Sequence, residues 1–286
     1  MLTGAEHDLT QGENTAYNRL WDAVGAVGNR SNPMSKLIVY QCGVVDYDAC
    51  VAFQENCVAE LRAAASATEA RTCATKSTLA CAETPWPQPA LPGYLLLVRH
   101  APVITIGRGG SPTNIIASPK HLAAAGVRVR ACSRGGDVTY HGPGQIVGYP
   151  IIALRDHGRD VHAYLRRLEE IIIRTLDDFG VTGRRRPGFT GVWVGTPDNN
   201  CEKIAAVGVA IRGWVTYHGF ALNVDPDLTH FALIHPCGIR NCEVTSLRRC
   251  LGRAVPEAEV EERLIHHFAD AFGFDEVERR RKFLLD

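Results

Sequence analysis

The residue whose surroundings most favour covalent chemistry is a cysteine that stands between proline and glycine. Cys237 lies at the centre of residues 235–239, which read His-Pro-Cys-Gly-Ile. Proline and glycine favour a loop over a packed helix or strand, and loops on a rigid scaffold often carry nucleophiles. The alternative is a buried structural thiol, which is the commoner role of a cysteine. This segment alone leaves both interpretations open.

A glycine-rich segment over residues 134–145, RGGDVTYHGPGQ, has the composition of a ligand-binding loop. Its four glycines would let backbone amides approach a bound molecule closely, and Arg134 and His141 would add directed donors. The alternative is a tight hairpin, because Gly-Pro-Gly is typical of turns. The segment lacks the Gly-x4-Gly-Lys-Ser/Thr pattern of a phosphate-binding loop.

A third segment places a single lysine at the start of an apolar run. Lys203 precedes residues 204–211, and a second apolar segment follows at 214–223. Gly208 and Gly219 leave room beside these segments, where a long, thin ligand could lie. The alternative is an edge-strand lysine that points to water.

These segments need a scaffold, and the sequence periodicity supplies candidates for it. Residues 204–211 and 215–224 predict two strands joined by a short turn. Residues 160–179 predict a helix with an apolar stripe, capped by Asp160 at its start and stopped by Gly180. Strands and helices are mixed without βαβα alternation, which predicts the α+β class.

The composition is that of an ordinary globular protein. The 286 residues include 31 basic and 31 acidic side chains and are 45% apolar, which argues against nucleic-acid binding by bulk charge and against wholesale disorder. No apolar run approaches the ~18 residues of a membrane helix, and the N-terminus lacks the apolar core of a secretory signal. The ten cysteines form no Cys-x2-Cys pair, so we expect reduced thiols in a soluble, cytoplasmic protein.

We expect one domain with appendages. Residues 1–35 are rich in Gly, Asn and Ser and predict a mobile N-terminal extension. Residues 36–274 form the predicted catalytic domain, interrupted by an Ala- and Pro-rich insertion at about 66–92. Residues 275–286 are interpreted as a basic C-terminal tail.

Taken together, in this order and spacing, the three segments resemble the lipoyl(octanoyl) transferase family, the octanoyl-[acyl-carrier-protein]:protein N-octanoyltransferases. The motifs of that family read close to RGGxxTYHGPGQ, KIAxIGV, WVTxHGxALN and a PCGI that leads into VTSL. This chain has matching residues at 134–145, 203–209, 214–223, 236–239 and 244–247. The resemblance covers roughly residues 36–274. It departs at Val207 and Phe220, where the family commonly has Ile and Leu.

The resemblance implies a fold and a mechanism. The implied fold is a mixed, largely antiparallel sheet with flanking helices, of the type of the biotin and lipoate protein ligase catalytic domains. Cys237 would take the octanoyl group as a thioester, and Lys203 would activate this thiol, since an ammonium within ~4–6 Å can lower a thiol pKa by ~1–3 units. His141 and His218 are alternatives for the base. The residues implied in acyl binding are Arg134, Gly135, Gly136, Asp137, Val138, Thr139, Tyr140, His141, Ala206, Val207, Gly208, Gly219, Phe220 and Ala221.

The implied reaction is the first step of endogenous lipoate biosynthesis, in which octanoyl passes from octanoyl-acyl carrier protein to a lysine of a lipoyl domain. The implied acceptors are the lipoyl domains of 2-oxoacid dehydrogenase complexes and the glycine cleavage H protein. No cofactor, metal, nucleic acid or membrane is implied. The basic runs 184–186 and 279–282 are candidates for docking an acidic carrier, and solvated basic faces are an equally good interpretation of them.

Two other functions fit parts of the sequence. An ATP-dependent lipoate or biotin protein ligase would share the fold but would need to cradle a phosphate and would not need an acyl-cysteine. A zinc-binding regulatory protein would use His235, Cys237 and Cys242, although this spacing lacks the close ligand pairs of structural zinc sites. The motifs favour the transferase over both.

Overall fold

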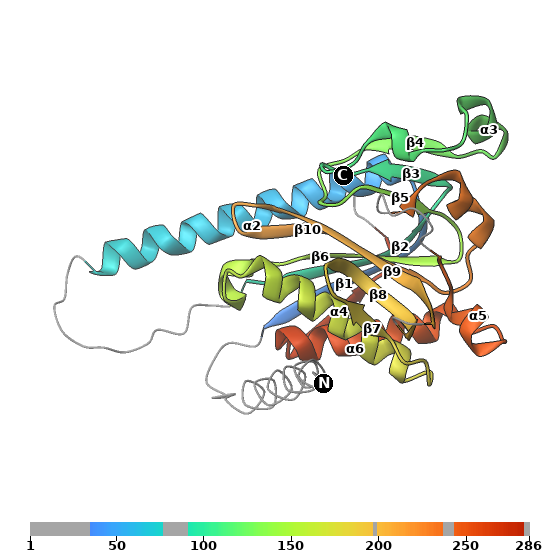
Figure 1. Cartoon of the computed structure of the whole chain (residues 1–286). Coiled ribbons are helices and arrows are strands. Elements are labelled where there is room, and N and C mark those ends of the chain that lie inside the picture. The colour runs from blue at the N-terminus through green and yellow to red at the C-terminus, as the bar shows by residue number, and fades with distance from the viewer. Residues whose placement is uncertain (1–34, 77–90, 197–198, 237–242, 283–286) are drawn as a thin grey trace, which may run out of the picture.

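The protein is built around a large mixed sheet, with a small sheet at one end and helices on both faces (Figure 1). The computed structural model describes residues 35–76, 91–196, 199–236 and 243–282, with the side chains of 68–76 and 199–200 excepted. The short helix that the sequence suggests near 17–27 and most of the N-terminal extension therefore lie outside the described residues. In the described part, no helix is both long enough and apolar enough to cross a bilayer.

Within the described residues the large sheet has eight strands and is mostly antiparallel. From one edge to the other these are β11 (Glu276–Arg280), β1 (Lys36–Val45), β2 (Gly93–His100), β6 (Gln145–Ile151), β10 (Val215–Asn223), β9 (Asn199–Arg212), β8 (Phe189–Thr196) and β7 (Arg184–Arg186). β1 pairs in parallel with both β2 and β11, and the other neighbours pair antiparallel. This topology confirms the predicted α+β class and the largely antiparallel sheet.

The remaining elements surround this sheet. In the small sheet, β3 (Val103–Ile106) lies between β4 (Arg128–Ala131) and β5 (Val138–His141). The helix α2 (Tyr47–Lys76) packs on one face of the large sheet, and α4 (Val161–Asp177) and α6 (Glu257–Phe272) pack on the other (Figure 1). The shorter helices are α3 (Pro119–Ala124) and α5 (Leu247–Leu251).

Strand β2 shows why both faces of the sheet are covered. Its side chains alternate between two cores: Leu95 and Leu97 pack with α4 and α6, whereas Leu96 and Val98 pack with α2. All four side chains are fully buried. A strand with two buried faces has a continuous apolar sequence, and β2 reads Tyr-Leu-Leu-Leu-Val.

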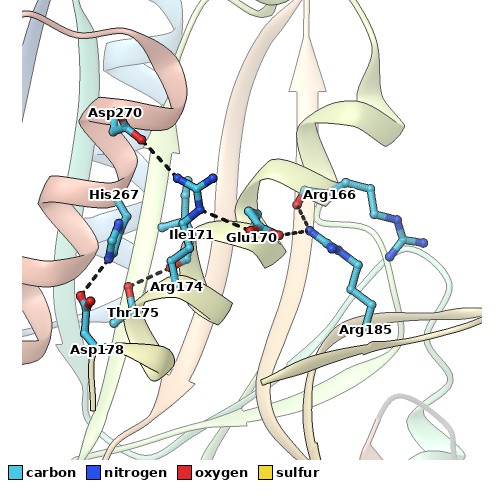
Figure 2. Close-up of polar contacts among 9 residues, drawn as sticks. All are labelled: Arg166, Glu170, Ile171, Arg174, Thr175, Asp178, Arg185, His267 and Asp270. Atoms are coloured by element: carbon cyan, nitrogen blue, oxygen red, sulfur yellow. Dashed lines mark hydrogen bonds and ion pairs between the residues drawn. The ribbon is translucent and has the colours of Figure 1, made fainter. Parts of the chain in front are cut away.

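Polar contacts hold α4 against its neighbours (Figure 2). Arg174 donates to Glu170 in the same helix at 3.3 Å and to Asp270 of α6 at 3.2 Å. His267 Nε2 and Asp178 Oδ2 lie 2.8 Å apart at the end of the same helix pair. Exposed ion pairs such as these add little stability one by one, so the apolar stripe provides most of the packing energy.

Helix α2 is longer than the sequence pattern predicts. Apolar residues that recur at helical spacing predict a helix from Asp46 to Ala65, whereas α2 continues to Lys76. Residues 66–76 contain no Gly or Pro and are rich in Ala, so nothing in the sequence stops the helix there. The insertion predicted at about 66–92 therefore starts as helix, and residues 77–90 lie outside the described residues.

The C-terminal segment also differs from the prediction of a basic tail. Residues 276–280 form β11, which pairs in parallel with β1 at the edge of the sheet. The guanidinium of Arg279 forms an ion pair with Glu262, and Arg280 donates to the hydroxyl of Tyr40 at 2.9 Å. The domain therefore extends at least to Arg280, and these two arginines already have partners within the fold.

Candidate active site

A cavity of about 420 Å³ lies where the central strands meet the glycine-rich loop. Its wall contains the predicted catalytic residue Lys203 and all but one of the predicted acyl-binding residues: Arg134, Gly135, Gly136, Asp137, Val138, Thr139, His141, Ala206, Val207, Gly208, Gly219, Phe220 and Ala221. These residues are far apart in the sequence, and β5, β9, β10 and the loop before β5 bring them together. The volume is in the range of small-molecule binding sites.

Tyr140 is the predicted acyl-binding residue that the cavity wall does not include. Its hydroxyl lies 2.7 Å from Nδ1 of His230, and its ring packs edge-on against Phe231 at 5.5 Å. Side chains alternate along β5, so Tyr140 packs into the small core beside the sheet while His141 faces the cavity.

Arg134 holds the glycine-rich loop in place. Its side chain is almost fully buried, and its Nη2 donates to the carbonyl oxygen and the hydroxyl of Thr105, both at 2.8 Å. Its Nη1 donates to the carbonyl oxygen of Gly135 at 3.0 Å. The guanidinium therefore uses several donors on the protein itself, which makes the loop rigid before any ligand binds.

Asp137 connects the same loop to the segment that leads toward Cys237. The Asp137 carboxylate accepts hydrogen bonds from Ser111 N at 3.1 Å and from the Asn114 side chain. The carbonyl oxygen of Asn114 accepts from the backbone N of His235 at 2.8 Å. The loop and residues up to 236 are therefore held together by this short network.

The buried His141 and His218 line the cavity, and the ring of buried His100 lies 6.1 Å from that of His141, centroid to centroid. Burial lowers the pKa of His218 to about 4, with the nearby Arg134 adding to the effect. Burial lowers the pKa of His141 well below its usual value, and His100 and Arg134 act in the same direction. Burial also lowers the pKa of His100, whose Nε2 lies 2.8 Å from the Tyr149 hydroxyl. All three rings are therefore uncharged at neutral pH, which suits an apolar ligand.

Lys203 is buried at the cavity wall rather than directed to water. Its residue is only 4% exposed, and Nζ donates to the carbonyl oxygen of Thr190 at 3.2 Å. Nζ also lies 4.7 Å from the centre of the Trp193 ring, where a cation interacts favourably with the aromatic face. A buried ammonium beside a cavity is the environment expected of a functional lysine and not of a solvated edge residue.

Cys237 itself lies outside the described residues, but described residues on either side of it are found near Lys203. Pro236 and Lys203 line one small cavity together with Val244. The backbone N of Lys203 donates to the carbonyl oxygen of Glu243 at 2.8 Å. The chain that follows residues 237–242 is therefore bonded to Lys203, and Pro236 before them lines a small cavity with it.

The cavity wall also contains residues that the sequence did not predict, namely Tyr47, Val147, Tyr149, Val161, Leu165, Gly188, Phe189, Thr190 and Val209. His218, the predicted alternative for the base, lies in the wall as well. Tyr47 and Thr190 gave no local signal, since only the folded chain brings them near the glycine loop. Glu169 could have been noticed in the sequence, because it is an acidic residue within the apolar stripe of α4, and the structure shows it fully buried. An acidic residue on a buried helix face marks a specific polar role.

Among the described residues, no group of three or more His, Cys, Asp or Glu side chains could hold a metal ion. Cys237 and Cys242 of the zinc alternative lie outside them. The two predicted docking runs are partly engaged: Arg185 pairs with Glu170 at 2.7 Å, and Arg186 stacks over Phe189 at 4.6 Å. Arg184 in the first run stays exposed.

Known proteins share both the sequence motifs and the fold. The family model of the lipoyl protein ligase A/B catalytic domain matches residues 75–269. An octanoyltransferase of Geobacter metallireducens is 42% identical over 224 residues, which cover 78% of this chain and 88% of that protein. One of Flavobacterium psychrophilum is 49% identical over 65% of this chain and 80% of its own length. A third, of Myxococcus xanthus, is 49% identical, and the match spans 52% of its length.

Solved structures agree on the fold at low sequence identity. A bipartite lipoate protein ligase from Thermoplasma acidophilum superposes with a TM-score of 0.60 at 14% identity, covering 89% of each chain. A lipoate-protein ligase A bound with ATP superposes with a TM-score of 0.58 at 14% identity, covering 89% of this chain and 90% of the other. Such low identity supports the fold and carries no statement about substrates.

The fold and the cavity thus define a class, and the chain belongs to the lipoyl protein ligase A/B catalytic-domain family. Within that family it falls among the octanoyltransferases, with which it shares 42% to 52% of its residues over the matched region. These findings confirm the family, the enzyme class and the fold class that the motifs predict.

Proposed function

We propose that this enzyme moves an octanoyl group from octanoyl-acyl carrier protein to a lysine of a lipoyl domain, through a thioester on Cys237. The observation that carries the proposal is the burial of Lys203 at the wall of the cavity, where its backbone is bonded to Glu243, directly after residues 237–242, and where it lines a small cavity with Pro236, directly before them. Family membership supports the octanoyl transfer.

In the first half-reaction the Cys237 thiolate attacks the carbonyl carbon of the carrier thioester. The new sulfur–carbon bond forms as the bond to the carrier sulfur breaks, and the Lys203 ammonium gives a proton to the departing thiolate. One thioester replaces another, so the step needs no external energy source. A free thiol with a pKa of ~8.5 is only a few per cent ionised at pH 7, which is why a neighbouring ammonium matters.

In the second half-reaction the neutral amine of the acceptor lysine attacks the acyl-Cys237. An amide forms, Cys237 leaves as a thiolate, and Lys203, neutral after the first step, takes up the proton that the acceptor amine loses. The enzyme returns to its starting protonation state. General acid–base help of this kind typically contributes about 10²–10⁴ in rate.

The acyl chain would lie along the apolar part of the cavity wall, which includes Ala206, Val207, Phe220 and Ala221. Eight carbons at ~0.8 kcal/mol per buried methylene supply about 5–6 kcal/mol of binding energy. That energy selects for chain length gradually, because each methylene changes affinity only about fourfold. The uncharged rings of His141 and His218 in the wall bring no charge that would have to lose its hydration when an alkyl chain binds.

The proposed partners are an acyl carrier protein as donor and, as acceptors, the lipoyl domains of 2-oxoacid dehydrogenase complexes and the glycine cleavage H protein. We place this activity in the cytoplasm, where such thiols stay reduced. Arg184 is exposed near the loop 188–190 of the cavity wall and offers a positive charge to an acidic carrier.

The test is the intact mass of the enzyme after mixing with octanoyl-acyl carrier protein. We expect a mass gain of one octanoyl group, lost on treatment with neutral hydroxylamine and absent in Cys237→Ala. Adding a lipoyl domain should discharge the adduct and add the same mass to the domain. An enzyme that instead modified the domain from free octanoate and ATP, with no adduct, would be a ligase and would overturn the proposal.

A further inference from the structure

One peptide group, between Thr190 and Gly191, is held from both sides by charged side chains. Its carbonyl oxygen, on Thr190, accepts a hydrogen bond from Lys203 Nζ at 3.2 Å. Its N–H, on Gly191, donates to Oε1 of Glu169 at 2.9 Å. The carboxylate of Glu169 and the ammonium of Lys203 therefore bind opposite ends of the same peptide dipole.

Glu169 is placed for this contact at some energetic cost. It projects from the apolar face of α4 and is fully buried, where an unpaired carboxylate would be strongly disfavoured. Its other oxygen, Oε2, lies 2.6 Å from Nη1 of Arg166 and 3.3 Å from Nε of Arg185. Both arginines are partly exposed, so they neutralise the carboxylate from the solvent side and leave Oε1 for the peptide.

The peptide needs such support because the strand is irregular at this point. Gly191 has φ +124, a conformation that side-chain-bearing residues rarely adopt. A Cβ there would come within 2.6 Å of the Ala205 carbonyl oxygen. The pairing of β8 with β9 runs from Val192 onward and shifts register directly after it. The carboxylate of Glu169 thus takes the place of a strand partner for the Gly191 N–H.

Arg185, which pairs with Glu169, also binds two other groups of α4. Arg185 of β7 donates to the carbonyl oxygen of Arg166 at 3.1 Å and to Oε2 of Glu170 at 2.7 Å (Figure 2). Through these bonds β7 is tied to α4 at the position of Glu169. The N–H of Gly191 itself is bound by Glu169 and not by Glu170.

We propose that Glu169 is a positioning residue, which orients the Thr190–Gly191 peptide so that its carbonyl oxygen fixes the ammonium of Lys203 beside the reacting thiol. This inference rests on the proposed role of Lys203. Hydrogen bonds in a polarised series strengthen one another, so the buried carboxylate also strengthens the bond from Lys203 to the carbonyl oxygen. Glu169 itself touches neither substrate nor thiol.

The experiment compares Glu169→Gln with Glu170→Gln as a matched control. Both variants remove one carboxylate from the same turn of α4 and one partner of Arg185, but only the first alters the contact with the Gly191 N–H. The readout is the pH dependence of alkylation at Cys237, followed on the tryptic peptide 213–240, which contains this one cysteine. The rate of the first half-reaction is measured in a single turnover.

We expect Glu169→Gln to move the alkylation profile to higher pH, in the direction of Lys203→Ala, and to slow acyl-enzyme formation by about 10- to 100-fold. Glu170→Gln should match the unmodified enzyme. In a Lys203→Ala background, Glu169→Gln should add little further loss, because its target is gone. Glu169→Asp keeps the charge but moves the carboxylate oxygen away from the Gly191 N–H, so it should shift the alkylation profile by an intermediate amount. This variant takes the place of Glu169→Gln if the glutamine variant folds poorly.

Two negative results are distinguishable. If Lys203→Ala shifts the profile but neither Glu169 variant does, while thermal unfolding shows folded proteins, Glu169 is merely structural and this inference fails alone. If Lys203→Ala leaves the profile unchanged, the role proposed for the lysine fails and the inference fails with it.

Discussion

Gly208 and Gly135 lie in backbone contact: a Cβ on residue 208 would come within 2.9 Å of the carbonyl oxygen of Gly135. The backbone N of Gly135 also donates to the carbonyl oxygen of Val209 at 2.8 Å. The glycine-rich loop therefore rests directly on β9, and the small residue at 208 makes this contact possible. The shape of the cavity depends on it, since Gly135 and Gly208 both lie in its wall.

Replacing Gly208 by alanine should lift the loop from the strand. Because the facing atom is backbone, the loop has to shift, and we expect a loss of about 1–3 kcal/mol in the free energy of unfolding. The acyl-enzyme should also form more slowly at low octanoyl-carrier concentration. Gly135→Ala is the control, since a Cβ there meets its nearest atom at an ordinary 3.5 Å. Equal losses in the two variants would contradict the steric explanation.

The charge of Lys203 and its ability to release a proton can be separated. Lys203→Ala should raise the pH at which Cys237 alkylates and lower turnover by about 10²–10⁴. Lys203→Arg keeps a positive charge that cannot be given up at neutral pH. Lys203→Arg should therefore raise the pH at which Cys237 alkylates less than Lys203→Ala does. It should still block transfer from the acyl-enzyme to the acceptor, because that step needs a residue that can take up a proton. A Lys203→Arg enzyme that turns over normally would show that proton transfer by this residue is not needed.

Stability should fall on mild acidification because of the buried histidines. The pKa of His218 is lowered to about 4 in the folded protein, against an ordinary value of about 6.5 when unfolded. The unfolded chain therefore binds more protons between these values, so stability is full above pH 6.5 and decreases as pH falls toward 4. We expect a loss of roughly 1–2 kcal/mol from this residue between pH 7 and 5, measured by urea unfolding.

The variant His218→Gln isolates that effect. It should flatten the dependence of the free energy of unfolding on pH in this window, whatever its stability at pH 7. Burial also lowers the pKa of His141, so the free energy of unfolding of the variant should still decrease somewhat as the pH falls. If the slope of the variant equals that of the unmodified protein, His218 does not titrate on unfolding as its burial implies.

Phe220 should limit the length of the acyl chain. Its ring lies in the cavity wall, and it packs so closely on Gly148 that a Cβ there would fall 2.2 Å from Cζ of the ring. Phe220→Leu should open the cavity and shift the preference from octanoyl toward decanoyl by about 4- to 20-fold, given ~0.8 kcal/mol per methylene. Competition between the two acyl carriers measures this ratio.

Tyr140→Phe is the matched control for chain length. Tyr140 precedes His141 on β5 but faces Phe231 and His230 instead of the cavity. The variant should lose some stability with its hydrogen bond and keep the chain-length preference. A preference altered as much as in Phe220→Leu would mean that the acyl chain follows a different path.

The sequence predicted the fold where its signals are local. The helix at 160–179 has an apolar stripe, a capping aspartate and a terminal glycine, and the structure forms it as α4 from Val161 to Asp177. The end of α2 and the strand β11 were missed because neither has a local stop or periodicity. β11 is mostly charged, with Val277 as its one apolar residue, and only its pairing with β1 makes it a strand.

The candidate site, too, could be predicted from the sequence only where its residues belong to local motifs. The glycine loop, Lys203 and the small residues of β9 and β10 have motifs distinctive enough to be grouped from the sequence alone. Tyr47 and Thr190 reach the cavity only through tertiary packing, and no spacing in the sequence brings them near residues 134–139. Tyr140 could not be separated from His141 without the direction of each side chain on β5.

The position of β11 has a practical consequence for engineering. Because β11 occupies one side of β1, a shortened chain ending before Glu276 would present the amide and carbonyl groups of β1 to solvent. Unpaired backbone groups along an edge strand pair with strands of other molecules, so we expect such a truncation to aggregate. A minimal version of the enzyme should therefore keep β11, even though none of its residues lies in the cavity wall.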